Sequence, residues 1–168
     1  VLKPHQKKRI LTFIFPGSDS DASYQVDKAR IAIGSGKLFG KGLYEGIQTQ
    51  AESGGVPIKE SDFIFTVVGE ELGFIGALVM IILIYFILMR CLYIAKNSRD
   101  KFGSFLVAGV TAMFAFHFIE NIGMCVGVLP VTGIPLPFVS YAGTAMITNY
   151  VALGIVLSVS MRRKRTLF

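Results

Sequence analysis

The sequence has no tryptophan, only two cysteines and two histidines, and few charged residues for a chain of 168 residues. Charged residues make up 17% of the chain and apolar residues 52%, with 14 phenylalanines and a mean hydropathy of +0.59. Soluble domains carry about 25% charged residues and fewer apolar ones. The shortage of charge therefore excludes a soluble domain and indicates a membrane protein.

Three stretches lack any Asp, Glu, Lys or Arg, at residues 72–89, 102–119 and 122–161. About 20 apolar residues in a helix cross the roughly 30 Å hydrocarbon core of a bilayer. Pro130, Pro135 and Pro137 interrupt the third stretch, which predicts irregular backbone at residues 127–140. We predict an all-α polytopic membrane protein with three transmembrane helices, at about residues 63–89, 102–121 and 141–161.

The lysines and arginines are distributed unevenly over the segments outside these spans. The loop between the first two spans and the tail at 162–168 are basic, whereas the loop between the last two has no Lys or Arg. Short cytoplasmic loops carry the positive excess in membrane proteins. We therefore predict a cytoplasmic C-terminus and an extracytoplasmic region at residues 1–62, although this region holds nine Lys and Arg. Cys91 and Cys125 then lie about a membrane thickness apart and cannot pair without rearrangement.

The extracytoplasmic region is expected to form short helices that pack on the membrane. Tyr24, Lys28 and Ile31 have helical spacing, and the glycines from residue 34 onward end that helix. The glycine-rich stretch at 34–46 carries two lysines and is a candidate anion cradle built from backbone N–H groups. The chain starts at Val1 without a signal peptide, so we expect it to continue from a longer polytopic protein.

Three carboxylates stand at the start of the first predicted span: Asp62, Glu70 and Glu71. Ionisable groups at membrane depth are costly, so a functional role is the default hypothesis. In a helix, the step from Asp62 to Glu70 turns about 80° and rises roughly 12 Å, which places the two at successive depths. Asp62 could instead cap the helix that begins at residue 63. Glu70 and Glu71 could pair inside the bundle or contact substrate or metal.

Several short motifs, taken in order, carry a resemblance to a known family. They are YQ at 24–25, IAIGSG at 31–36, GKG at 40–42, QTQ at 48–50, DFIF at 62–65, GEELG at 69–73, NIGM at 121–124 and LPVTGIPLPFVSY at 129–141. With these motifs the chain resembles the SEDS family, the RodA/FtsW/SpoVE group, and its RodA side more than its FtsW side. The resemblance implies the C-terminal part of the fold: the large external loop and the last three of ten helices, in the bacterial cytoplasmic membrane.

The resemblance also implies an activity, that of a peptidoglycan glycosyltransferase for cell-shape maintenance or division. Such an enzyme polymerises lipid II by joining the 4-hydroxyl of one disaccharide to C1 of another, with release of undecaprenyl diphosphate. Asp62 matches the family's essential external-loop aspartate and would be the general base. The implied partners are lipid II, undecaprenyl diphosphate, membrane lipids and a bitopic class B penicillin-binding protein.

Other side chains are candidates for holding the substrate or a metal ion. Cationic residues of the external region could neutralise a diphosphate, or simply face solvent and lipid headgroups. Ser140 and Tyr141 could line the cavity, and Glu70 and Glu71 could touch substrate. His117 and Glu120 lie one helical turn apart, too few ligands for a metal site, so a requirement for Mg²⁺ or Mn²⁺ stays open. The candidate cationic residues are Lys28, Arg30, Lys37, Lys41 and Lys59.

Two other functional hypotheses remain. A lipid-linked precursor flippase or transporter would use the intramembrane carboxylates and depend on an ion gradient. A non-catalytic scaffold for a penicillin-binding protein would tolerate loss of Asp62. Departures from the family pattern, at residues 58–61, Glu120 and Ala142, bear on substrate positioning, and Ala142 would be strained if its φ were positive. A nucleic-acid role does not fit, because the basic residues sort by membrane side and base-stacking aromatics are lacking.

Overall fold

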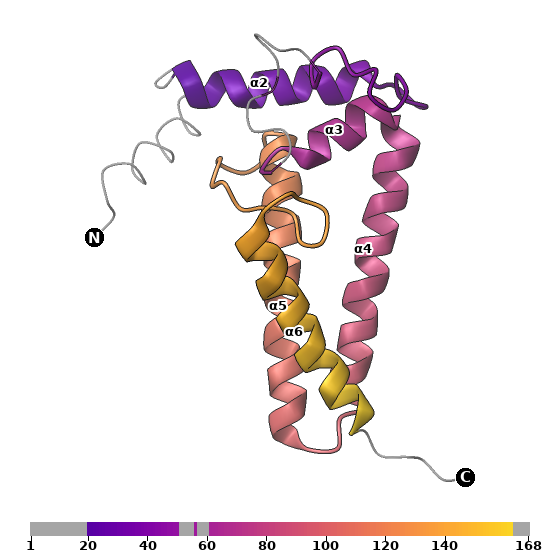
Figure 1. The fold of residues 1–168 in the computed structure, drawn as a ribbon, viewed down its shortest axis with the longest axis vertical. Coiled ribbons are helices and arrows are strands. Elements are labelled where there is room, and N and C mark those ends of the chain that lie inside the picture. Colours follow the sequence, from indigo (N-terminus) through magenta and orange to yellow (C-terminus); the bar gives the residue numbers. More distant parts are fainter. Residues whose placement is uncertain (1–19, 51–55, 57–60, 163–168) are drawn as a thin grey trace.

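The computed structural model describes residues 20–50, 56 and 61–162, and this part of the chain is helical without any strand. Its elements are α2 (Ser20–Ser35), α3 (Ile64–Glu71), α4 (Gly73–Lys96), α5 (Lys101–Cys125) and α6 (Gly143–Met161). Figure 1 shows α4, α5 and α6 along the long axis, with α2 lying across one end of the molecule next to α3. The all-α prediction is confirmed.

The three long helices are each apolar and long enough to cross a membrane, which confirms three spans within the described residues. A tight turn at residues 97–100 joins α4 to α5, and Asp100 caps α5 by accepting a hydrogen bond from the Gly103 N–H. The C-terminal end of α6 lies at this same end of the bundle, opposite α2 (Figure 1). Many large apolar side chains of α4 remain exposed, as expected for a surface that faces lipid or further helices.

The predicted first span at 63–89 is not one helix, because the chain breaks between α3 and α4. Gly73 has φ +68°, and a Cβ there would lie 2.2 Å from the backbone nitrogen of Gly40. The glycine-rich segment also supplies the carbonyls that accept the first free N–H groups of α4: Lys37 O from Phe74 N, and Leu38 O from Ile75 N. The break therefore comes from a close approach of two backbones that are more than 30 residues apart in sequence.

The other predicted boundaries differ by up to seven residues, the largest difference being at the end of α4, which continues to Lys96 where the prediction ended at 89. Helix α5 continues to Cys125, and α6 begins at Gly143. The segment between them, residues 126–142, is non-helical, as the three prolines in it predict. One side of this segment is buried in the bundle, since Leu136 packs with Phe114 and Phe118 of α5.

Helix α2 ends at Ser35, where the glycines begin, and its inner face is made of small residues. Ala29 and Ala32 are fully buried and pack with Phe63, Phe65 and other residues of one apolar cluster. Small side chains allow the α2 backbone to approach α3 closely: a Cβ at Gly36 would lie 2.0 Å from the Gly69 carbonyl oxygen. This packing fixes the glycine-rich segment above the start of α4.

Candidate active site

Asp62 lies in the turn before α3, where this turn meets the end of α5 and the irregular segment 126–142. The Asn121 side chain of α5 donates from Nδ2 to the Asp62 carbonyl and to the Ile134 carbonyl, each at 2.8 Å. Cys125 Sγ, one turn further along α5, lies 3.9 Å from the same Asp62 carbonyl. Asn121 thus joins the turn that carries Asp62, far away in sequence, to the end of α5 and to the segment that follows it.

The neighbouring carbonyl, that of Ser61, is held from the other side. The Ser140 hydroxyl donates to Ser61 O at 2.5 Å and accepts from Leu136 N at 2.7 Å. Ser140 is buried, and its hydroxyl is occupied by these two backbone partners, whereas the adjacent Tyr141 is 80% exposed. Of these two predicted substrate-binding residues, Ser140 thus contacts the turn that carries Asp62, and Tyr141 is free to contact other molecules.

The Asp62 carboxylate itself is half-buried and has few protein contacts among the described residues. Oδ1 accepts a hydrogen bond from Ser61 Oγ at 2.8 Å. Oδ2 faces Gly133, which has φ +76° and where a Cβ would lie 3.2 Å from that oxygen. Asp62 does not cap α3, because the cap position is Phe63 and no side chain bonds to the first turn. The capping interpretation is therefore wrong, and the carboxylate is available for another purpose.

Glu70 is fully buried at the far end of α3, and the glycine-rich segment is folded around its carboxylate. Oε1 accepts from Lys41 Nζ at 2.6 Å and from Gln48 N at 3.0 Å, and Oε2 accepts from Thr49 N at 2.8 Å. Burial would raise the pKa of Glu70, but these N–H groups and the Lys41 ammonium outweigh it and lower the pKa to about 2. The Glu70 carboxylate is ionised and paired with Lys41, in line with the prediction that it pairs inside the bundle.

Of the predicted anion cradle at 34–46, Lys41 binds an anion of the protein itself, whereas the backbone N–H donors, Gln48 and Thr49, lie just beyond that stretch. A Cβ at Gly46 would lie 2.9 Å from Glu70 Oε2, so this glycine lets the backbone approach the carboxylate. Glu71, also buried, accepts from Gln50 Nε2 at 2.9 Å, and its carbonyl accepts from Gly42 N at 3.1 Å. Both glutamates bind residues 41–50 to α3, and Lys41 is paired with one of them.

The remaining predicted cations have different positions. Arg30 donates from Nε to Val126 O at 3.0 Å and from Nη2 to Gly127 O at 3.2 Å, which ties α2 to the end of α5. Lys28 Nζ lies 5.4 Å from the centre of the Tyr24 ring. Lys37 is exposed with φ 50°. Lys59 lies outside the described residues.

The possible metal ligands His117 and Glu120 do not gather with others. Glu120 is buried and accepts a hydrogen bond from Thr132 Oγ1 at 2.9 Å. Within the described ranges, no group of three or more His, Cys, Asp or Glu side chains could hold one metal ion. Glu120, a departure from the family pattern, thus bonds the irregular segment to α5. Ala142, another departure, has an extended backbone with φ −150° and is not strained.

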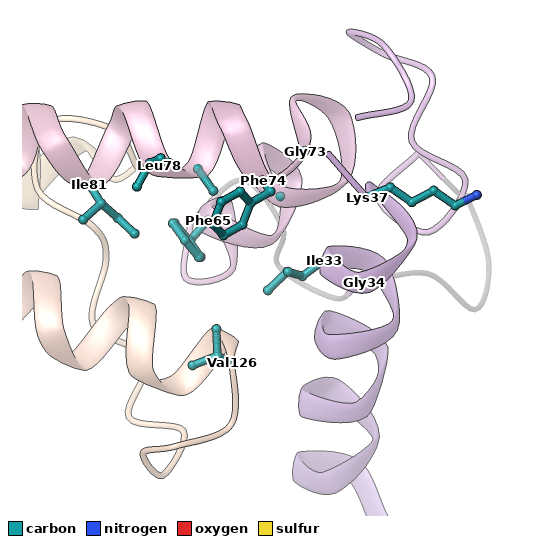
Figure 2. Close-up of a pocket in the computed structure, with 11 residues that line it drawn as sticks. Ile33, Gly34, Lys37, Phe65, Gly73, Phe74, Leu78, Ile81 and Val126 are labelled. Carbon is teal, nitrogen blue, oxygen red and sulfur yellow. The ribbon is translucent and has the colours of Figure 1, made fainter. Parts of the chain in front are cut away.

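An apolar cavity of about 380 Å³ lies between α2, the α3–α4 junction and the end of α5. Ile33, Phe65, Phe74 and Val126 line it, and Figure 2 shows these side chains converging while the Lys37 side chain extends away from them. An apolar hollow of this size could take part of a hydrocarbon chain. Gly34 and Lys37, at the start of the glycine-rich segment, also line it.

The sequence matches the model of the family described as "Cell cycle protein", that of FtsW, RodA and SpoVE, over residues 1–165. The chain belongs to this family. It is 40% identical over 165 residues to the peptidoglycan glycosyltransferase MrdB of Escherichia coli strain K12, covering 98% of this chain and 44% of MrdB. It is 37% identical over 164 residues to the peptidoglycan glycosyltransferase RodA of Treponema pallidum, covering 97% of this chain and 37% of RodA.

Two solved structures of the family superpose on the fold. One is a chain of a peptidoglycan synthase complex, with a TM-score of 0.77 and 27% identity over 98% of this chain and 44% of that one. The other is an aspartate-to-alanine mutant of the Thermus thermophilus rod shape determining protein RodA, with a TM-score of 0.62 and 31% identity over 82% of this chain and 40% of RodA. This family member thus spans less than half the length of the relatives it matches.

The motif residues of the family member divide into groups that the sequence alone could not separate. Ser140 bonds to the turn that carries Asp62. Glu70 bonds instead to Lys41 of the glycine-rich segment, and these residues form a separate structural unit. Sequence reasoning assigned no role to Asn121, although a carboxamide at the end of an apolar span is a signal that could have identified it.

Proposed function

We propose that the whole protein is a peptidoglycan glycosyltransferase that polymerises lipid II, with Asp62 as its general base. The observation that carries the proposal is the Asp62 turn: two consecutive backbone carbonyls are held by Asn121 and Ser140, while the carboxylate stays half-exposed. A base must be fixed in place and still reach its substrate. The names of the relatives from Escherichia coli and Treponema pallidum support the same activity.

The chemical step requires one displacement. The 4-hydroxyl oxygen of one saccharide attacks C1 of another, a C–O bond forms, and the bond from C1 to the diphosphate oxygen breaks. Asp62 takes the hydroxyl proton, and undecaprenyl diphosphate leaves with the electron pair. A single in-line displacement inverts C1 and needs no carboxylate nucleophile.

The diphosphate needs positive charge near it. Lys37 is exposed, whereas Lys41 is paired with Glu70 and Arg30 bonds to carbonyls. The described residues offer no cluster of metal ligands for Mg²⁺ or Mn²⁺.

The arrangement in the membrane follows from the basic segments. We propose that residues 1–62 are extracytoplasmic and that α6 ends at the cytoplasmic face, since basic residues follow α4 and α6. A bitopic class B penicillin-binding protein is the proposed partner, and the similarity to a chain of a peptidoglycan synthase complex supports it.

The test is lipid II polymerisation by the purified full-length protein with its cognate transpeptidase. Asp62→Asn removes the base with little change of shape and should reduce glycan product by about 10²–10⁴-fold. Asp27→Asn is the matched control, because Asp27 is exposed on α2 and the chemical change is the same. Equal product from wild type and Asp62→Asn would exclude Asp62 as the base. No product from either, with partner binding retained, would favour the flippase or scaffold hypothesis.

A further inference from the structure

Asn121 is completely buried near the end of α5, and both hydrogens of its amide are used. One goes to the carbonyl of Asp62 and the other to the carbonyl of Ile134, each at 2.8 Å. These two carbonyls belong to separate segments, the turn before α3 and the irregular segment 126–142. A single side chain therefore sets the distance between them.

The orientation of the amide follows from its partners, since a nitrogen facing two carbonyl oxygens must be the donor. Its oxygen, Oδ1, then has no hydrogen-bond partner among the described residues, although it is buried. A buried polar group left unsatisfied is unfavourable, but an apolar side chain would leave the carbonyls of Asp62 and Ile134 without this donor. Asn121 therefore satisfies two backbone carbonyls while its own oxygen is left without a partner among the described residues.

The contacts of Asn121 converge on the same turn as those of Ser140. Asn121 holds Asp62 O, and Ser140 holds Ser61 O. Both side chains bond to backbone carbonyls, so they fix the position of the backbone that carries the Asp62 side chain. They leave the two carboxylate oxygens of Asp62 unoccupied by these bonds. Gly133 lies next to Oδ2 and belongs to the segment that Asn121 also holds at Ile134.

We propose that Asn121 is a positioning residue for the glycosyl transfer, acting through the backbone of Asp62. It holds the base at a fixed distance from the irregular segment, so that the carboxylate meets the attacking hydroxyl in one geometry. This inference rests on the proposed function of Asp62. It assigns to Asn121 no contact with the substrate.

The experiment measures kcat and KM for lipid II in the full-length protein with its transpeptidase, per folded molecule. Displacement of a catalytic group by about 1 Å can cost about 10²-fold in rate. Asn121→Ala should therefore lower kcat by about 10²-fold and leave KM within about twofold of wild type. Asn97→Ala is the matched control: Asn97 is exposed at the end of α4, and its Nδ2 also donates to a backbone carbonyl. The control should retain the wild-type kcat.

Ser140→Ala serves as a second variant if Asn121→Ala yields too little folded protein, and it should also lower kcat with KM retained. A variant whose folded fraction falls while kcat per folded molecule is unchanged would overturn the inference, because Asn121 would then be merely structural. If Asp62→Asn is inactive and both positioning variants keep the wild-type kcat, only this inference fails. If Asp62→Asn is fully active, the proposed base fails and the positioning role fails with it.

Discussion

Lys41 and Glu70 form a salt bridge in which the ammonium nitrogen lies 2.6 Å from a carboxylate that is fully buried. The two residues come from the glycine-rich segment and from α3, and backbone N–H groups of Gln48 and Thr49 complete the carboxylate's partners. Removing one partner of such a buried pair leaves the other charge uncompensated. The pair therefore holds the glycine-rich segment against α3, the helix that follows Asp62.

Glu70→Gln should destabilise the full-length protein by about 3–5 kcal/mol, because it leaves the Lys41 ammonium without its carboxylate. Unfolding in detergent micelles, followed by thermal or chemical denaturation, would measure the loss. Glu45→Gln is the matched control, since Glu45 is exposed in the same segment, and it should change stability by no more than about 0.5 kcal/mol. Equal stability of the two variants would contradict the structural role of Glu70.

The pH dependence follows from the lowered pKa of Glu70. The pKa is about 2 in the folded protein against an ordinary value of 4.5, so the stabilisation is fully present above about pH 4.5. It is lost as the pH falls from about 4.5 toward 2, because protonation then favours the unfolded chain. The melting-temperature difference between wild type and Glu70→Gln should narrow over this range. A difference that stays constant down to pH 2 would show that folding does not lower the pKa of Glu70.

Gly40→Ala should disrupt the junction of α3 and α4. Gly40 has φ +79°, and a Cβ there would lie 2.0 Å from the carbonyl oxygen of Glu71. The strained φ alone costs about 1–3 kcal/mol, and the collision adds to it. Gly34→Ala is a control of opposite sign: Gly34 lies in α2 with no atom within 4 Å of its added Cβ, so alanine should stabilise by up to about 1 kcal/mol. Melting temperatures of the two variants would test the contrast.

Arg30→Lys separates two roles of the guanidinium. The structure uses Nε and Nη2 to bond two carbonyls at the end of α5, a fork that lysine cannot reproduce. If these two hydrogen bonds stabilise the fold, Arg30→Gln should lower the free energy of unfolding by about 1–2 kcal/mol. Arg30→Lys should then be no more stable than Arg30→Gln. If Arg30 serves chiefly as a charge for diphosphate, lysine should instead restore polymerisation. Lys28→Gln, a change at a cation that faces a tyrosine ring, is the comparison.

The sequence predicted the spans well, because absence of charge over about 20 residues is a local signal. It could not predict the break before Gly73, since the cause is a contact with Gly40 that only the folded chain contains. The irregular segment at 126–142 was predictable from its prolines, as was the end of α2 from the glycines that follow Ser35.

The candidate site was predictable in part. Asp62 stood out by its position, but the sequence could not show that Glu70 belongs to a different unit from Asp62, because both lie on one short helix and its preceding turn. The cations illustrate the same limit: Lys41 and Arg30 were interpreted as diphosphate ligands, and their actual partners come from residues 29 and 96 positions away. The site assignments themselves stay predictions until polymerisation is measured.

The hydrogen bonds at the Asp62 turn bear on the order in which the protein assembles during synthesis. The backbone carbonyl of Asp62 accepts its hydrogen bond from Asn121, 59 residues later in the chain. The carbonyl of Ser61 accepts from Ser140, 79 residues later. Long-range contacts of this kind form late, after the chain that supplies them is available. The turn therefore lacks these hydrogen bonds until α5 and the segment up to Ser140 have left the ribosome. A nascent chain that is interrupted earlier contains Asp62 without the bonds from Asn121 and Ser140 that hold its turn in place.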